Sequence, residues 1–309
     1  MTSLIKINNI SKTFGSFLAV DNLSFSIRKG EILGFLGPNG AGKTTTMRIL
    51  TGFLAPTRGT VEIKGQNLTN NSINCRKLIG YVPEGSPLYN EMTVIDFLKF
   101  ICEIREIEGL EIEKKVNSVV KLLKLENVIF QKIETLSKGF KRRVGLAQAI
   151  VHNPEILILD EPTDGLDPNQ KNDVRNLIKE LGKDKAIIIS THILEEINAL
   201  CNRTMIISEG KLLIDDKPLN ILKMSEFYNS IKLAVEEKDS FELKKTLISS
   251  KVAKFVDIED ELCIIKTKNY KRQKEEINKF LKRQTLTIKH LSTAKGSLEE
   301  VFRKMTSNE

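Results

Sequence analysis

A glycine-rich turn between a strand-like segment and a helix-forming segment constrains the fold most. Residues 31–36 read EILGFL, and residues 37–44 read GPNGAGKT, which fits G-x-x-x-x-G-K-[ST] at every fixed position. Glycines let the backbone wrap closely and turn its N–H groups inward, and the next helix directs its positive N-terminal end to the same place. The turn therefore predicts a cradle for phosphate groups at the end of a strand.

The side chains of this turn predict a nucleotide site with Mg²⁺. Lys43 is expected to reach the terminal phosphates, and the Thr44 hydroxyl to bind the metal ion. A chance glycine-rich turn is the alternative, but the strand before it and the helix after it argue against chance. The predicted nucleotide-binding residues of the turn are Gly37, Pro38, Asn39, Gly40, Ala41, Gly42, Lys43, Thr44 and Thr45.

A second segment, EILILDEP at 155–162, limits the types of reaction that a phosphate-binding protein of this kind could catalyse. An apolar strand here ends in two carboxylates. Asp160 is expected to hold Mg²⁺, directly or through water, and Glu161 to act as general base for a water that attacks the terminal phosphate. Both could instead be solvated turn residues, but an acidic pair at the end of an apolar strand is unlike an ordinary turn. Together the two motifs indicate hydrolysis of a nucleoside triphosphate.

The periodicity of apolar residues predicts an α/β fold. Strands alternate with helices around both motifs, which implies a mostly parallel sheet covered on both faces. Helical spacing over about 88–152 predicts a helical subdomain inserted within the sheet. The expected strands are 4–10, 23–27, 31–36, 60–63, 78–82, 156–159, 185–190 and 203–207, and the expected helices of the insertion are 93–107, 111–124 and 139–152.

The pattern changes after about residue 213, which predicts a second, small α+β domain. Its expected element order is βαββαβ, with a helix at the end of the chain. We therefore divide the chain into an ATP-binding domain, 1–218, and an accessory or regulatory domain, 219–309. The elements expected in the second domain are strands 230–236, 252–258, 261–267 and 285–291, and helices 240–249, 271–283 and 296–306.

Composition limits the class of protein. The net charge is +8, but the lysines are scattered, so no nucleic-acid partner is expected. The four cysteines lack the spacing of a zinc site. No apolar run approaches the ~20 residues of a membrane-spanning helix, and the first residues lack a signal-peptide pattern. We expect a cytoplasmic protein.

Several motifs together resemble those of the ATP-binding subunits of ABC (ATP-binding cassette) transporters. They occur in the order typical of that family and cover about residues 4–214. The matching segments are GPNGAGKT (37–44, Walker A), YVPE (81–84, Q-loop), LSKG (136–139, signature), DEP (160–162, Walker B), TDGLDP (163–168, D-loop) and STH (190–192, switch).

The resemblance implies a fold and further site residues. The fold is a P-loop NTPase (RecA-like) core with an antiparallel β subdomain and an inserted helical subdomain. Phe14 would stack on adenine, and His192 would join Lys43 and Glu161 as a catalytic residue beside the γ-phosphate. Glu84, where the family more often has glutamine, could ligate Mg²⁺, and Asp167 would belong to the D-loop.

In this family the signature segment contacts the ATP that is bound by a second subunit. Ser137, Lys138 and Gly139 would bind ATP held by the partner's Walker A segment, assisted by the N-terminal dipole of the helix that follows. A capped surface helix is the alternative if the stretch is taken alone. The segment reads LSKGF rather than LSGGQ, so Lys138 and Phe140 depart from the family pattern. Positive potential at this helix start is expected from Lys138, Lys141, Arg142 and Arg143.

The resemblance therefore implies an ATP-hydrolysing motor that forms a dimer and drives a separate transmembrane permease at the inner face of the membrane. A dimer of identical chains is expected, because each half would be complete. Similarity to gliding-motility, drug-export and copper-enzyme-maturation ATPases favours export over import. An ABC ATPase acting on the ribosome or on DNA is the alternative. It is disfavoured because one Walker A segment is present and the interval from Gly42 to Asp160 cannot hold a long coiled coil.

Overall fold

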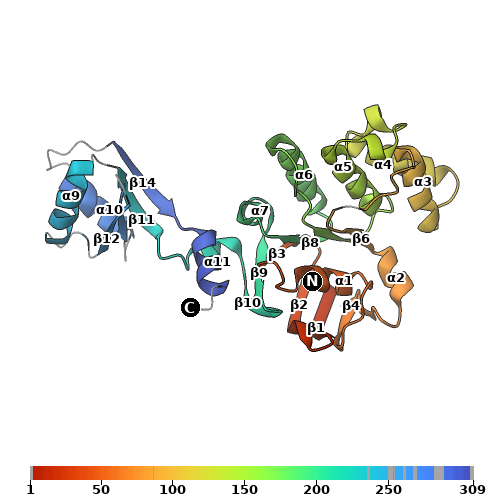
Figure 1. Cartoon of the computed structure of the whole chain (residues 1–309), viewed down its shortest axis with the longest axis horizontal. Helices are drawn as coiled ribbons and strands as arrows, with labels where there is room; N and C mark the ends of the chain where they lie inside the picture. The colour runs from red at the N-terminus through yellow and green to blue at the C-terminus, as the bar shows by residue number, and fades with distance from the viewer. Residues whose placement is uncertain are drawn as a thin grey trace. The chain divides into compact units, whose positions relative to one another are not determined.

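Two units make up the computed structural model of this chain, Met1–Lys217 and Pro218–Glu309 (Figure 1). The structure describes residues 3–85, 87–234, 237–249, 253, 255–259, 262–266, 270–281 and 289–306. In the described part of the chain, no helix is both long and apolar enough to cross a membrane.

A six-stranded sheet in the order β10-β9-β3-β8-β7-β6 forms the centre of the first unit. Neighbouring strands from β9 to β6 are parallel, and β10 pairs antiparallel at the edge. Strands β3, β7 and β8 are buried along their whole length, as expected of a parallel sheet covered on both faces. The bounds are β3 (Ile32–Leu36), β6 (Ile79–Val82), β7 (Ile156–Asp160), β8 (Ala186–Thr191), β9 (Arg203–Ser208) and β10 (Lys211–Asp216).

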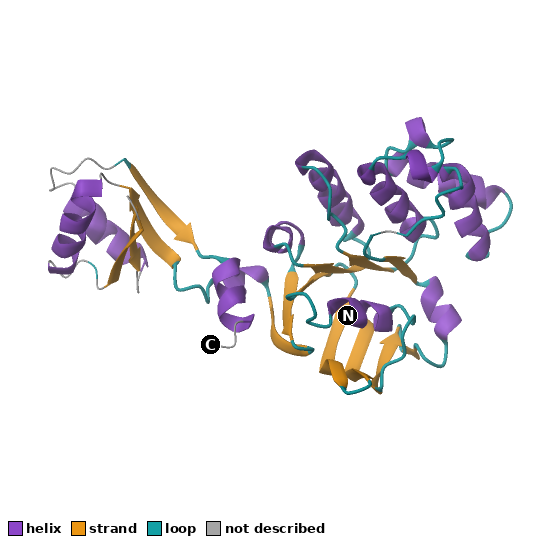
Figure 2. Cartoon of the chain, viewed as in Figure 1, coloured by secondary structure: helices purple, strands orange, loops and turns teal. Residues whose placement is uncertain are grey.

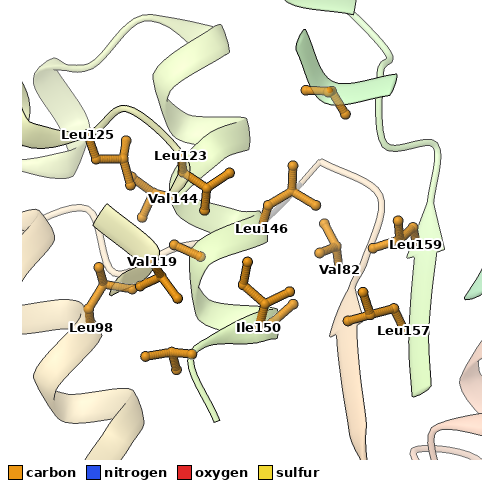
Figure 3. Close-up of a cluster of buried hydrophobic side chains, with 14 of the residues drawn as sticks. Val82, Leu98, Val119, Leu123, Leu125, Val144, Leu146, Ile150, Leu157 and Leu159 are labelled. Atoms are coloured by element: carbon orange, nitrogen blue, oxygen red, sulfur yellow. The ribbon is translucent and has the colours of Figure 1, made fainter. Parts of the chain in front are cut away.

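Helices cover one face of this sheet, and those between Val94 and Ile150 form the inserted helical subdomain. Leu157 and Leu159 of β7 pack with side chains of three helices, among them Leu98, Val119 and Leu146 (Figure 3). The Thr93 side chain caps the first of these helices by accepting from the Asp96 N–H. The bounds are α3 (Val94–Ile104), α4 (Leu110–Leu122), η1 (Glu126–Val128), η2 (Ile133–Thr135), α5 (Lys138–Ile150), α6 (Pro168–Leu181) and α7 (Leu194–Leu200).

An antiparallel sheet in the order β2-β1-β4-β5 shares a core with the other face of the central sheet. Ile156 and Ile158 of β7 point into this second core, because successive side chains of a strand face opposite ways. Strands β1 and β2 run well beyond the expected 4–10 and 23–27. The bounds are β1 (Ser3–Phe14), β2 (Phe17–Arg28), α1 (Lys43–Leu50), β4 (Arg58–Ile63), β5 (Gln66–Asn67) and α2 (Ser72–Lys77).

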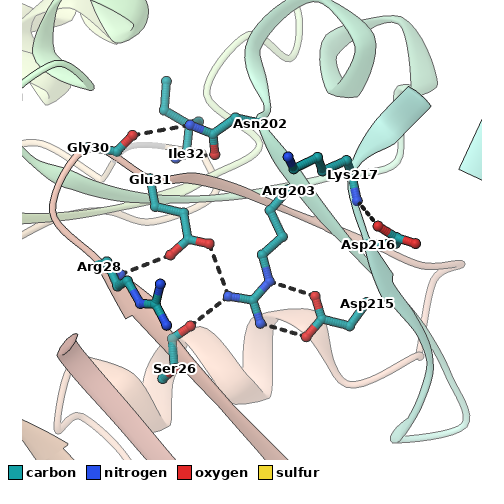
Figure 4. Close-up of polar contacts among 10 residues, drawn as sticks. All are labelled: Ser26, Arg28, Gly30, Glu31, Ile32, Asn202, Arg203, Asp215, Asp216 and Lys217. Carbon is teal, nitrogen blue, oxygen red and sulfur yellow. Dashed lines mark hydrogen bonds and ion pairs between the residues drawn. The ribbon is translucent and has the colours of Figure 1, made fainter. Parts of the chain in front are cut away.

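Arg203 of β9 ties both sheets together (Figure 4). Its Nε and Nη2 each donate over 2.6 Å to the carboxylate of Asp215 on β10. Its Nη1 donates to the Glu31 carboxylate over 3.0 Å and to the Ser26 carbonyl of β2 over 2.7 Å. The bidentate bond to Asp215 contributes most to raising the Arg203 pKa above its ordinary value. The guanidinium therefore stays charged and fixes four segments to one another.

The second unit contains a four-stranded antiparallel sheet in the order β12-β13-β11-β14 (Figure 2). Side chains of β11, β12, β13, α9 and α10 share one core. The expected βαββαβ order is confirmed, and the short helix α8 before it was not expected. The bounds are α8 (Pro218–Leu222), β11 (Tyr228–Ala234), α9 (Glu237–Ser249), β12 (Phe255–Glu259), β13 (Leu262–Lys266), α10 (Tyr270–Leu281), β14 (His290–Lys295) and α11 (Leu298–Thr306).

The last strand of the second unit differs from the prediction. A strand was expected at 285–291, but β14 begins at His290 and continues to Lys295. Residues 282–288 lie outside the described part. In α11, the Glu300 carboxylate accepts from the Ser225 hydroxyl and, over 2.8 Å, from the Glu226 N–H. The final helix is therefore fixed to the loop after α8 within its own unit.

Candidate functional site

Four neighbouring strands of the central sheet end at the same edge and carry the predicted motifs. Strands β3, β8, β7 and β6 are adjacent and parallel, so their carboxyl ends lie together. The glycine-rich turn follows β3, His192 follows β8, and Glu84 lies in the loop after β6. Asp160 ends β7, and Glu161 comes directly after it. In open α/β sheets this edge is where ligands bind.

A cavity of about 460 Å³ lies at this edge. Phosphate-loop residues, carboxylates and His192 face it together, although they are far apart in sequence. The lining residues are Phe17, Ala19, Asn39, Gly40, Gly42, Lys43, Thr44, Thr45, Glu84, Asp160, Glu161, Asp164 and His192.

The glycine-rich turn has the backbone geometry that only glycine tolerates. Gly42 has φ +96°, and a Cβ there would lie 2.4 Å from the carbonyl oxygen of Ala19. Helix α1 begins at the next residue, so its first N–H groups face the cavity edge. The Lys43 ammonium donates to the carbonyls of Gly37 (2.7 Å) and Pro38 (3.1 Å).

Burial and nearby carboxylates act in opposite directions on Lys43. Desolvation lowers the Lys43 pKa below its ordinary value, while Glu161, Asp160 and Glu84 raise it. The lysine is thus a buried cation that faces three carboxylates across the cavity.

The end of β7 carries two buried carboxylates with different surroundings. Asp160 is 1% exposed, and neither of its carboxylate oxygens has a hydrogen-bond partner among the residues that the structure describes. Glu161 has φ +49°, and its N–H donates to the Ser190 carbonyl over 2.9 Å. Its Oε1 lies 2.8 Å from Nδ1 of His192. The unpartnered oxygens of Asp160 fit a hard cation, which prefers oxygen ligands.

The aromatic side chain at the cavity is Phe17. Phe14, predicted to stack on the base, ends β1 opposite Phe17 across the hairpin, and its ring carries the Lys12 ammonium 5.2 Å from its centroid. The sequence interpretation missed Phe17, Ala19 and Asp164 as lining residues. Asp164 could have been found, because it belongs to the TDGLDP segment.

The signature segment lies at the start of α5. Ser137 is the N-cap residue and accepts from the Phe140 N–H over 3.4 Å. Gly139 is buried against Gln170, where an added Cβ would meet the Gln170 side chain at 2.5 Å. Asp167 caps α6 by accepting from the Gln170 N–H over 2.9 Å. None of residues 137–139 lines the cavity of its own chain.

Arg142 differs from the prediction. It was expected to raise the positive potential at the start of α5, but only 6% of it is exposed, and its Nη2 donates to the Glu161 carbonyl over 2.7 Å. The reason is helical spacing: Arg142 lies on the buried side of α5 with Leu146, whereas Lys141 is partly exposed.

Within the described ranges, no group of three or more histidine, cysteine, aspartate or glutamate side chains could hold a metal ion. A Mg²⁺ site need not appear as such a cluster, because Mg²⁺ usually keeps waters and takes one or two carboxylates together with substrate phosphates.

Comparisons with known proteins agree with this geometry. Residues 20–164 match the family model described as "ABC transporter". The chain is 33% identical to the bacitracin transport ATP-binding protein BcrA of Bacillus licheniformis, over 99% of this chain and 98% of BcrA. It is also 33% identical to Nod factor export ATP-binding protein I of Burkholderia lata, over 99% of this chain and 97% of the relative.

A solved structure described as the dimeric structure of MJ0796, a bacterial ABC transporter cassette, matches with a TM-score of 0.64. The two chains are 26% identical, and the match covers 69% of this chain and 98% of MJ0796. The P-loop fold predicted from sequence is thus confirmed. The chain belongs to the ATP-binding proteins of ABC transporters, which are ATPases of transport.

Proposed function

We propose that this chain is the motor subunit of an exporter. Two copies bind MgATP at their interface and drive a separate transmembrane permease at the inner face of the membrane. The observation that carries the proposal is the meeting of Lys43, Asp160, Glu161 and His192 at one cavity. No nucleic-acid partner is part of this function.

Within one chain, the turn 37–45 binds the phosphates through backbone N–H groups and the Lys43 ammonium. Asp160 and the Thr44 hydroxyl would hold Mg²⁺, and Glu84, which lines the same cavity, would be a further ligand. Bound Mg²⁺ would neutralise charge on the phosphates during transfer. Either Phe14 or Phe17 contacts the base.

Glu161 is proposed as the general base. Its carboxylate lies at the cavity and 2.8 Å from Nδ1 of His192, so it can take a proton from an attacking water while the imidazole fixes its orientation. Lys43 and His192 stabilise the charge on the transferred phosphoryl group.

Ser137, Lys138 and Gly139 are proposed to bind the ATP of the second copy, close to Asp167 of the D-loop. Their position away from their own chain's cavity, at the N-terminus of a 13-residue helix, supports this role. The described dimer of a similar cassette supports an interface between copies.

Export is favoured because a relative matched along nearly its whole length is described as a Nod factor export protein. The role of the second domain, 219–309, is proposed as accessory or regulatory. An ABC ATPase that acts on the ribosome or on DNA is the second candidate, but no feature of the described structure favours it.

One variant tests both halves of the proposal. A tagged Glu161→Gln chain is expressed in its own host, and membranes are solubilised in mild detergent with MgATP. We expect the variant to retain ATP, to lose about 10²–10⁴-fold in hydrolysis rate, and to co-purify a polytopic membrane protein.

Normal hydrolysis by this variant would contradict the role of Glu161. Co-purification of ribosomal proteins or DNA-bound complexes, with no membrane protein, would favour the second candidate. The wild-type chain, purified in the same way, is the control for hydrolysis and for partner recovery.

A further inference from the structure

We infer that Arg142 is a positioning residue for the general base: its guanidinium holds the peptide of Glu161 in the conformation that directs the carboxylate toward the cavity. The inference rests on the proposed role of Glu161. Arg142 would therefore act within its own chain, whereas residues 137–139 at the start of the same helix are proposed to bind the partner's ATP.

The backbone of Glu161 is strained. A φ of +49° lies in the left-handed region, which is sterically unfavourable for a residue with a Cβ. Such a conformation persists only where its surroundings fix it. Two bonds hold the peptide on either side of the Cα: the Glu161 N–H donates to the Ser190 carbonyl, and Arg142 donates to the Glu161 carbonyl over 2.7 Å.

The conformation matters for the direction of the side chain. With this φ, the Glu161 carboxylate reaches His192 and the cavity, while the preceding Asp160 points its own carboxylate into the same edge. A relaxed φ at Glu161 would rotate the Cα–Cβ bond away from this arrangement. Holding the carbonyl oxygen thus controls the direction of the carboxylate on the other side of the Cα.

Arg142 is suited to the task by charge as well as by position. Desolvation lowers the Arg142 pKa, and a group of carboxylates at the end of β7 and in the neighbouring loops opposes this effect. These carboxylates stabilise the charged guanidinium. The carboxylates are Asp164, Glu161, Asp160 and Glu84. A neutral donor at this position, such as a hydroxyl, would lack the electrostatic attraction to these carboxylates.

The contact also joins two parts of the first unit. Arg142 lies on α5, five residues after the signature Ser137, and Glu161 follows the sheet strand β7. A shift of α5 relative to the sheet would therefore move the Glu161 carbonyl directly.

The test uses the purified full chain with Arg142→Met, which keeps much of the side-chain volume but has no N–H donor. We expect kcat for ATP hydrolysis to fall about 10–100-fold, because displacing a catalytic group by about 1 Å can cost 10²-fold. The ATP dissociation constant should change by less than about twofold, since the lost interaction acts on the base and not on bound ATP.

Arg105→Met is the matched control. Arg105 is also partly buried, and it donates to the carbonyls of Arg76 (2.8 Å) and Ile79 (3.4 Å), away from the cavity. It should keep the wild-type kcat even if its melting temperature falls. Guanidinium ion added to Arg142→Ala should restore part of kcat, a result that a purely structural role would not give.

The outcomes separate this inference from the proposed function. Wild-type kcat in Arg142→Met, or an equal loss in Arg105→Met with no rescue by guanidinium, would overturn the inference while Glu161→Gln stays inactive. Normal hydrolysis by Glu161→Gln would instead overturn the role of Glu161. If Arg142→Met does not fold, Arg142→Lys takes its place: a kcat lowered at unchanged ATP affinity supports the inference, and wild-type kcat refutes it.

Discussion

Acidification should destabilise the first unit through one histidine, His152. This residue follows α5, and its Nε2 lies 3.2 Å from the Ile79 carbonyl oxygen, so this nitrogen carries the hydrogen and donates. Its Nδ1 is buried and has no hydrogen-bond partner in the described ranges. Burial lowers the His152 pKa from 6.5 to about 4, and Arg105, Lys115 and Lys185 add to the shift, while the bond to Ile79 opposes it.

The direction of the pH effect follows from linkage. Because the folded pKa is depressed, the unfolded chain binds the proton first as pH falls below 6.5. The stability is therefore fully present above pH 6.5 and is lost progressively as pH falls toward 4. Integrating between these two pKa values gives a loss of about 2 kcal/mol from roughly pH 7 to pH 5 for this residue alone.

The assay is urea unfolding followed by far-UV circular dichroism, in the wild-type chain and in His152→Gln. Glutamine does not titrate, so the difference in unfolding free energy between the two chains should change by about 2 kcal/mol in favour of the variant between pH 7 and pH 5. Replacement of His290, which lies exposed in the second unit, controls for the loss of a histidine as such. Parallel pH dependences in wild type and His152→Gln would refute the reasoning.

Two further substitutions, with one exposed ion pair as a comparison, test the packing of the first unit. Arg203→Met should lower the unfolding free energy by about 2–3 kcal/mol, because it leaves the Asp215 and Glu31 carboxylates without their shared cation. Lys29→Met, which removes an exposed ion pair, should cost less than about 1 kcal/mol by the same urea assay, and equal effects would contradict this. Gly80→Ala should lower the melting temperature, at a cost of about 1–3 kcal/mol, because the new Cβ would lie 2.0 Å from the Ala149 carbonyl oxygen; an unchanged melting temperature would show that α5 moves away from β6 freely.

The parts of the structure that were predictable are those where local chemistry leaves few choices. The turn at 37–44 needs glycine at left-handed positions, and EILILDEP needs a buried strand with its carboxylates at the end, so both could be located before their contact was known. Their meeting at one edge follows from parallel strands, whose carboxyl ends coincide. The roles of the individual side chains in the reaction stay predictions until the variants above are measured.

The sequence was least informative where a tertiary contact decides the element. Strands β1 and β2 extend beyond the apolar runs because backbone pairing from Phe14↔Phe17 back to Ser3↔Arg28 holds polar residues in the ladder. Phe17 lines the cavity although it lies in a hairpin that is distant in sequence from the phosphate loop, and no local pattern predicts this position. In the second unit, β14 continues past the expected end at residue 291 because its pairing with β11 extends to Tyr228↔Lys295.

Arg142 shows why residue type alone can mislead. Four of the six residues from Lys138 to Arg143 are basic, and in sequence they form one cationic run. On a helix with 3.6 residues per turn they cannot share a direction. The run is thus divided between solvent and core, and its buried member, Arg142, donates to the Glu161 carbonyl. A cationic run at a helix start acts as one electrostatic feature only when its residues lie on the same face of the helix. In this run Arg142 is the buried residue, and its replacement should lower kcat for ATP hydrolysis.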